Sequence, residues 1–353
     1  MPSGVNHLLF PLFALGIVVT GLVLIAVLSP LAEKLGLLDF PDDRKRHGEP
    51  VPMVGGISIY LVLLAAALTF PLPSKVSWLL ASVTLIVIIG FLDDIYGLGV
   101  RLRIGSQILA AMVMAIGSDV WLVDLGFIQL SENLWALGIA LTVFSVVGLV
   151  NAFNMSDGID GLSSGYALVA VGGIVFAQWL TGGFRYLEWL SVFGASVFAF
   201  WLVNMSLTPL KRVFLGDSGS MLLGFVIAWI LIEFSQSGVA SINPMAALWV
   251  VAFPVIDTVS VIISRLHRRQ SPFRADRHHL HHLLVDSGKS PRASLWILMS
   301  SALFFAALGI LITHELGAVA SLSAYLMLVI TVTIVHIRFM PSLLEGLNTW
   351  RKQ

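Results

Sequence analysis

The residues of this chain that could carry out chemistry are aspartates in short polar motifs between long apolar runs. Asp93 and Asp94 are adjacent, Asp157 and Asp160 are three residues apart, and Asp217 follows a glycine. Neighbouring carboxylates repel one another unless a proton or a cation intervenes. A hard divalent cation with oxygen ligands meets that need. The aspartates therefore indicate a site for a divalent cation.

Each aspartate motif alone also has a simpler interpretation. Asp93 and Asp94 could form a solvated helix end, and the Gly-Asp217-Ser-Gly motif could be a plain helix N-cap. Asp157 and Asp160 share a face if they are helical, but Asp157-Gly is also a turn signal. Asp257 lies within an apolar run and could be a satisfied intramembrane polar residue.

Histidines form the second polar cluster of the chain. Five of the nine histidines lie between His267 and His282, and four of them stand in the stretch Arg277-His-His279-Leu-His281-His282. Such a cluster could be a zinc site or a solvated loop. The arginines beside it, Arg265 among them, disfavour a bare cation and suit an anion such as phosphate.

The composition places these motifs in a membrane protein. Of 353 residues, 58% are hydrophobic and 11% are charged, against about 25% charged in soluble domains. No cysteine is present, which excludes disulfides, thiolate metal sites and a cysteine nucleophile. The net charge is zero, and no nucleic-acid partner is expected. No Lys or Arg precedes the first apolar run, so we expect a retained helix and not a removable signal peptide.

Apolar runs of about 20 residues predict roughly eleven transmembrane helices in an all-α, polytopic fold. Asp119 and Asp124 interrupt the apolar sequence between the spans 105–122 and 133–151, so the bounds of these two spans are the least well defined. We expect one domain over residues 1–353. The predicted spans are 8–30, 52–71, 77–95, 105–122, 133–151, 162–180, 187–204, 218–234, 244–264, 293–313 and 317–337.

Basic residues test these spans independently. If the N-terminus lies outside and the spans alternate, only Lys75 and Arg185 of the 20 Lys and Arg residues fall in outside segments. This asymmetry obeys the positive-inside rule and predicts a periplasmic N-terminus and a cytosolic C-terminus. The largest cytosolic loop is then 265–292. The paired aspartates and the histidines fall at the same, cytosolic face.

With these motifs in place, residues 30–300 resemble the polyprenyl-phosphate N-acetylhexosamine-1-phosphate transferases. The resemblance is strongest to the bacterial branch that uses UDP-N-acetylglucosamine and undecaprenyl phosphate. It rests on five motifs in the family's order: Leu-Asp39-Phe-Pro-Asp-Asp-Arg-Lys with Pro52-Met-Val-Gly-Gly56, Asp93-Asp94, Asn154-Met-Ser-Asp157-Gly-Ile-Asp160-Gly, Phe214-Leu-Gly-Asp217-Ser-Gly-Ser, and Ser271-Pro-Phe-Arg-Ala-Asp276-Arg277-His-His279-Leu-His281-His282.

The resemblance implies a reaction and assigns roles to residues. The phosphate of undecaprenyl phosphate would attack the diphosphate of a UDP-sugar, giving a polyprenyl-diphosphate-sugar and UMP, with Mg²⁺ or Mn²⁺ required. This would be the initiating step of a lipid-linked surface polysaccharide, at the bacterial inner membrane. Asp93 and Asp94 match the catalytic aspartates, and with Asp217 they are the expected metal ligands. The expected substrate-binding residues are Asn154, Asp157, Asp160, Asn204, Phe214, Arg265, Arg277, His279, His281 and His282, with Phe214 stacking on uracil.

Two departures separate the chain from the muramyl-pentapeptide branch. That branch has a Lys where this chain has Gly97, and an unbroken run of three histidines where Leu280 splits the run here. These departures favour the N-acetylhexosamine branch. They leave open another UDP-N-acetylated sugar, such as N-acetylgalactosamine or a 6-deoxyhexosamine. A homodimer is also left open, and a secondary transporter is the distant alternative.

Overall fold

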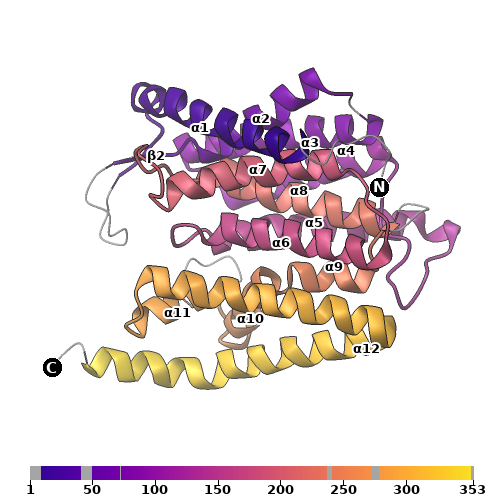
Figure 1. Cartoon of the computed structure of the whole chain (residues 1–353). Helices are drawn as coiled ribbons and strands as arrows, with labels where there is room; N and C mark the ends of the chain where they lie inside the picture. The colour runs from indigo at the N-terminus through magenta and orange to yellow at the C-terminus, as the bar shows by residue number, and fades with distance from the viewer. Residues whose placement is uncertain (1–8, 41–49, 72, 237–240, 272–277, 351–353) are drawn as a thin grey trace.

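The computed structural model describes residues 9–40, 50–71, 73–236, 241–271 and 278–350, with side chains described as far as Arg338. The fold is a bundle of helices that run roughly along one common axis (Figure 1). Its only sheet in those residues is the two-residue antiparallel pair β1 (Leu38–Asp39) and β2 (Val51–Pro52). The predicted all-α membrane fold is confirmed.

Each of the eleven predicted spans coincides with helical structure. The first eight correspond to α1 (Leu9–Leu35), α2 (Gly55–Thr69), α3 (Ser74–Tyr96), α4 (Val100–Ser118), α5 (Trp135–Ser156, preceded by the 3-10 turn Glu132–Leu134), α6 (Leu162–Thr181), α7 (Leu187–Asn204) and α8 (Gly216–Gln236). The last three correspond to α9 (Pro244–Val250) with α10 (Ala252–His267), and to the two halves of α12 (Pro291–Trp350). The short helix α11 (Leu280–Asp286) lies between α10 and α12 in the sequence.

Two of these elements depart from simple straight spans. The predicted span 244–264 is broken between α9 and α10, which meet at 76°. The helix α12 reverses direction at Gly317, whose φ of 82° favours glycine (Figure 1). Within the described residues, eight helices are long and apolar enough to cross a membrane, or nine with the bent pair. The chain is thus a multi-pass membrane protein, and the number of eleven crossings stays a prediction.

The helix α8 is the central element of the bundle. Every side chain from Ser218 to Ser235 is buried, and the helix packs most extensively against α3 and α5. Its 21 residues rise about 30 Å, enough to cross the hydrocarbon core of a bilayer. The two ends of α8 therefore mark the two ends of the bundle.

Glycines on α2 and α3 allow the first turn of α8, which begins at Gly216, to pack directly against these helices. A Cβ atom on Gly56 of α2 would lie 2.2 Å from the backbone nitrogen of Gly219. A Cβ atom on Gly90 of α3 would lie 2.3 Å from Cα of Ser218. Any side chain at either glycine would force the start of α8 away from α2 and α3.

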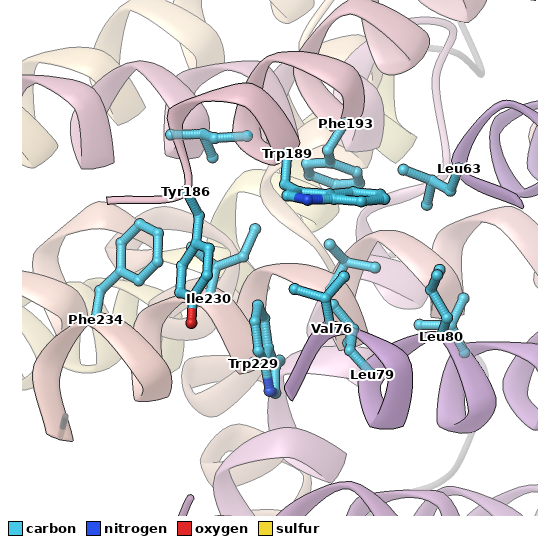
Figure 2. A pocket seen from close by; sticks show the side chains of 13 residues that line it. Leu63, Val76, Leu79, Leu80, Tyr186, Trp189, Phe193, Trp229, Ile230 and Phe234 are labelled. Atoms are coloured by element: carbon cyan, nitrogen blue, oxygen red, sulfur yellow. The ribbon is translucent and has the colours of Figure 1, made fainter. Parts of the chain in front are cut away.

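The opposite end of α8 holds the two basic residues that were predicted to lie outside. Glu233 is fully buried, and its carboxylate lies 3.0 Å from Nζ of Lys75 and 3.6 Å from Nη2 of Arg185. Beside this group lies an apolar pocket between α3, α7 and α8 (Figure 2). Aliphatic and aromatic side chains line it, and among the described residues its only charged neighbours are the Glu233 group, so it lacks the charged groups that a nucleotide sugar would need.

Candidate functional site

The paired aspartates stand at the end of α3, next to the first turn of α8. Oδ1 of Asp94 accepts a hydrogen bond of 2.7 Å from the backbone N–H of Asp217, and Oδ2 accepts one of 3.3 Å from that of Ser218. Asp94 thus satisfies backbone donors that a helix N-terminus leaves unpaired. Gly216 has a φ of +74°, and a Cβ atom there would lie 2.7 Å from Asp94. The Gly-Asp-Ser motif therefore permits this close approach.

Asp93 points to a different partner. Its carboxylate is buried and accepts hydrogen bonds from the backbone N–H of Leu98, at 2.6 Å, and from Nη1 of Arg103, at 2.9 Å. The same guanidinium atom lies 3.9 Å from Oδ2 of Asp217. Arg103 therefore bridges the paired aspartates and Asp217. Arg103 is one of the basic residues of the predicted inside loops, and nothing in the sequence motifs assigned it to the site.

Asp217 is held from a third helix by Asn154. The side-chain amide of Asn154, near the end of α5, donates to Oδ1 of Asp217 at 2.6 Å and to Oγ of Ser220 at 2.9 Å. Residues from α3, α4, α5 and α8, distant in the sequence, thus meet around one carboxylate. We call this group, Asp93, Asp94, Arg103, Asn154 and Asp217, the carboxylate site.

Asp157 and Asp160 do not share a helix face, because α5 ends at Ser156 and both lie in the following turn. Asp157 is exposed in that turn. The protein packed around its carboxyl group, and then repulsion from Asp217, Asp160 and Asp94, raises the pKa of Asp157. The site therefore has more negative charge than its own cations balance.

Asp160 joins the site to the predicted uracil contact. Its carboxylate accepts a hydrogen bond of 2.8 Å from Nη1 of Arg212, and the Arg212 guanidinium lies 5.2 Å from the ring centre of Phe214. The backbone of Phe214 is fixed by hydrogen bonds to Pro52 and Gly55. Arg212 is a second residue that sequence reasoning did not assign to the site.

Asn204 is buried, and both ends of its side-chain amide bind backbone groups. Its Oδ1 accepts from the N–H of Gly161 at 2.6 Å, and its Nδ2 donates to the carbonyl of Val213 at 2.9 Å. These bonds tie the Asp160 turn to the segment that carries Phe214. A role of Asn204 in substrate binding stays a prediction.

The histidine cluster approaches the Asp157 turn through His281. A Cβ atom on Gly158 would lie 2.0 Å from Nε2 of His281, so only glycine allows this contact. The rings of His281 and His282 are 4.1 Å apart, and those of His279 and His281 are 5.9 Å apart. The predicted convergence of the histidines with the aspartate motifs is therefore present.

His279 is anchored from the membrane side. Its Nδ1 lies 2.9 Å from Oδ2 of Asp257, whose Oδ1 accepts from the backbone N–H of Leu280 at 3.0 Å. Asp257 is thus the satisfied intramembrane residue that its simpler interpretation described. Arg265 is buried on the same helix, α10, and Arg277 lies outside the described residues.

The donor chemistry of the carboxylate site suits a hard cation. The described residues contain no group of three His, Asp or Glu side chains placed to hold a metal ion. Mg²⁺, however, is commonly held by one or two carboxylates together with substrate phosphates and water. Asp217 and the uncompensated charge around Asp157 fit that mode. The predicted joint ligation by Asp93, Asp94 and Asp217 stays a prediction.

Comparisons with known proteins relate the chain to a family of transferases. Residues 76–235 match the model of glycosyl transferase family 4. The chain is 36% identical over 290 residues to the undecaprenyl-phosphate alpha-N-acetylglucosaminyl 1-phosphate transferase of Escherichia coli (strain K12), covering 81% of this chain and 79% of that protein. It is 35% identical over 290 residues to the Haemophilus influenzae protein of the same description, covering 81% of this chain and 82% of that protein.

Proposed function

The chain belongs to glycosyl transferase family 4, and from this premise we propose that it transfers N-acetylglucosamine-1-phosphate from UDP-N-acetylglucosamine to undecaprenyl phosphate. The products are undecaprenyl-diphosphate-N-acetylglucosamine and UMP. The observation that carries the proposal is the convergence of α3, α4, α5 and α8 on Asp217. The relatives that carry this activity by name cover four fifths of the chain.

The chemistry joins two anions. An oxygen of the lipid phosphate attacks the sugar-bearing phosphorus of the diphosphate, and the bond from that phosphorus to the UMP oxygen breaks. A phosphate monoester carries about −1.5 to −2 charges at pH 7, so the attacking oxygen needs little deprotonation. Catalysis then consists mainly of positioning and charge neutralisation.

The described contacts suggest how the residues divide this work. Asp94 fixes the start of α8, and Asn154 orients the Asp217 carboxylate. Arg103 holds Asp93 and offers positive charge beside Asp217. Asp217 would hold the Mg²⁺ or Mn²⁺ ion, which supplies neutralising charge to the diphosphate. Asp93 and Asp94 thus act chiefly in positioning, with general-base work secondary.

Around this centre, the Asp160–Arg212–Phe214 group would receive the uridine, and Arg265, Arg277 and the histidines would contact phosphate oxygens. Because UDP-sugars are cytosolic, the carboxylate site faces the cytosol at the inner membrane in this proposal. One assay tests it directly. Purified protein with undecaprenyl phosphate, Mg²⁺ and a panel of UDP-sugars should release UMP fastest with UDP-N-acetylglucosamine.

Preference for UDP-N-acetylgalactosamine or a 6-deoxy sugar in that panel would correct the sugar. An absence of UMP release with every UDP-sugar would refute the reaction. Transport of a solute in proteoliposomes would then support the transporter alternative. Against that alternative, the aspartates of the carboxylate site lie at helix ends, whereas transporters place their sites near the bilayer midplane.

A further inference from the structure

The interface between α10 and the second half of α12 is lined by polar side chains within the membrane region. Oγ of Ser260 and Oγ1 of Thr333 form a hydrogen bond of 3.0 Å. Farther along, Nε1 of Trp249, in α9, donates to Oγ of Ser321 at 2.9 Å. Intramembrane polar groups are costly unless they are paired, and these pairs meet that requirement.

His336 breaks this pattern. It lies about one turn beyond Thr333 toward the end of the bundle that carries the carboxylate site, and it is 1% exposed. Neither of its ring nitrogens has a hydrogen-bond partner in the described structure. A buried polar group left unpaired costs roughly 1–3 kcal/mol. Such a group inside a membrane region indicates a ligand or a functional role.

Arg268, which acts electrostatically on His336, supplies a second unpaired group. It caps α10, and its Nη2 atom is buried without a hydrogen-bond partner in the described part of the chain. The charged and titratable groups that act on His336 are Asp257, His278, His279 and Arg268. Both oxygens of Asp257, the one acid among them, already bind His279 and Leu280. The interface between α10 and α12 thus holds the Arg268 guanidinium and the His336 ring with buried nitrogen atoms that no described acceptor satisfies.

We infer that Arg268 and His336 bind the phosphate group of a membrane lipid between α10 and α12. The guanidinium of Arg forms strong, directional hydrogen bonds to phosphate oxygens. Basic side chains between transmembrane helices near the cytoplasmic side suit an anionic lipid head group. Ile263 and Leu266 of α10 and Val335 of α12 are exposed apolar side chains beside them, so a lipid tail can lie along the same helices.

This site is separate from the carboxylate site. The path between them runs from His336 through Asp257, His279 and His281 to Gly158. The lipid phosphate can come from a phospholipid or from the polyprenyl-phosphate acceptor. Both present the same chemistry to Arg268 and His336, so the experiment must distinguish them.

The test uses the delipidated full chain in detergent and counts bound lipids by native mass spectrometry. Phosphatidylglycerol, undecaprenyl phosphate and the zwitterionic phosphatidylcholine are titrated separately. In Arg268→Gln and His336→Leu, the affinity for the anionic lipid should fall about tenfold or more. The matched controls Arg269→Gln, an exposed neighbour, and His314→Leu, at the far end of the first half of α12, should bind as the wild type does.

Thermal unfolding separates ligand binding from a structural role. Without lipid, His336→Leu should unfold at the wild-type temperature or above it, because two unpaired buried nitrogens are removed. With lipid, it should lose the rise in Tm that the wild type shows. A preference for phosphatidylglycerol or for undecaprenyl phosphate identifies the source. Equal binding by wild type and both variants, or equal binding of phosphatidylcholine, overturns the inference.

Discussion

At the scale of single residues, Asp217 is the carboxylate on which the site converges. Asp217→Asn keeps the size of the side chain and one acceptor oxygen for Asn154, but it removes the negative charge. We expect at least about a hundredfold loss of transfer, since charge stabilisation commonly contributes that much, with normal membrane insertion. UMP release and the amount of protein in membranes measure the two effects.

The matched control is Asp119→Asn, at the C-cap of α4. Asp119 has a φ of 53°, a conformation that Asn tolerates well, and it lies at the other end of the bundle. Transfer should be unchanged in this variant. Full activity of Asp217→Asn with the metal still required would remove Asp217 from the site.

A second prediction concerns the contact between Gly158 and His281. Gly158 does not need a left-handed backbone, so Gly158→Ala is strained only through its Cβ, which would lie 2.0 Å from the imidazole. We expect displacement of His281 and a fall in kcat/KM of about tenfold or more. A double-mutant cycle measures this contact: in a His281→Ala background, Gly158→Ala should have almost no further effect. An undiminished effect there would place its cause outside this contact.

The residue scale also shows what sequence reasoning could reach. The aspartates and histidines were found because their motifs interrupt apolar runs. Arg103 and Arg212 were missed because a basic residue at an inside loop is already explained by the positive-inside rule. One signal was available: Arg103 lies near Asp93 in sequence, just after the Leu98-Gly99 turn. Their 2.9 Å contact depends on the turn between α3 and α4, which hydropathy does not specify.

At the scale of elements, a substitution can test the close contact between α3 and the first turn of α8. Gly90→Ala would place a Cβ atom 2.3 Å from the backbone of Ser218, so α3 and α8 must separate. Overpacking of this kind typically costs 1–3 kcal/mol. We expect a lower Tm and, because Asp94 would lose its hold on Asp217, a larger proportional loss of kcat.

The control for that variant is Gly105→Ala in α4. Gly105 is exposed, and nothing lies within 4 Å of its added Cβ. Alanine there should leave Tm unchanged or raise it, since alanine favours the helix by up to about 1 kcal/mol. Wild-type stability and activity in Gly90→Ala would show that the contact between α3 and α8 is not essential.

Element positions were more predictable than element shapes. Runs of apolar residues located the long helices, because the thickness of a bilayer sets the length of such runs. The 76° bend between α9 and α10 was not predicted, since apolar composition continues through it. Pro254, in the first turn of α10, lacks a backbone N–H and is tolerated at a helix start. It was the one sequence signal that a new helix begins there.

At the scale of the whole molecule, charge asymmetry predicted that the aspartates and histidines share one face. The structure brings them together, and it places Lys75 and Arg185 around Glu233 at the other end. The sequence could predict this face because topology depends on summed charge. It could not predict the contacts within the site, which depend on glycine-mediated helix packing between distant segments.

Which end of the bundle faces the cytosol is the final prediction, and the absence of cysteine gives it a clean background. Exposed positions near the carboxylate site, Leu207→Cys and Ser290→Cys, should resist a membrane-impermeant thiol reagent in intact cells and react after permeabilisation. Glu132→Cys and Asn133→Cys, exposed at the other end, should react in intact cells. We expect this pattern because the opposite orientation would place 18 of the 20 basic side chains on the periplasmic side, against the positive-inside rule. The reversed pattern would place the carboxylate site away from cytosolic UDP-sugars, and the proposed reaction would fail with it.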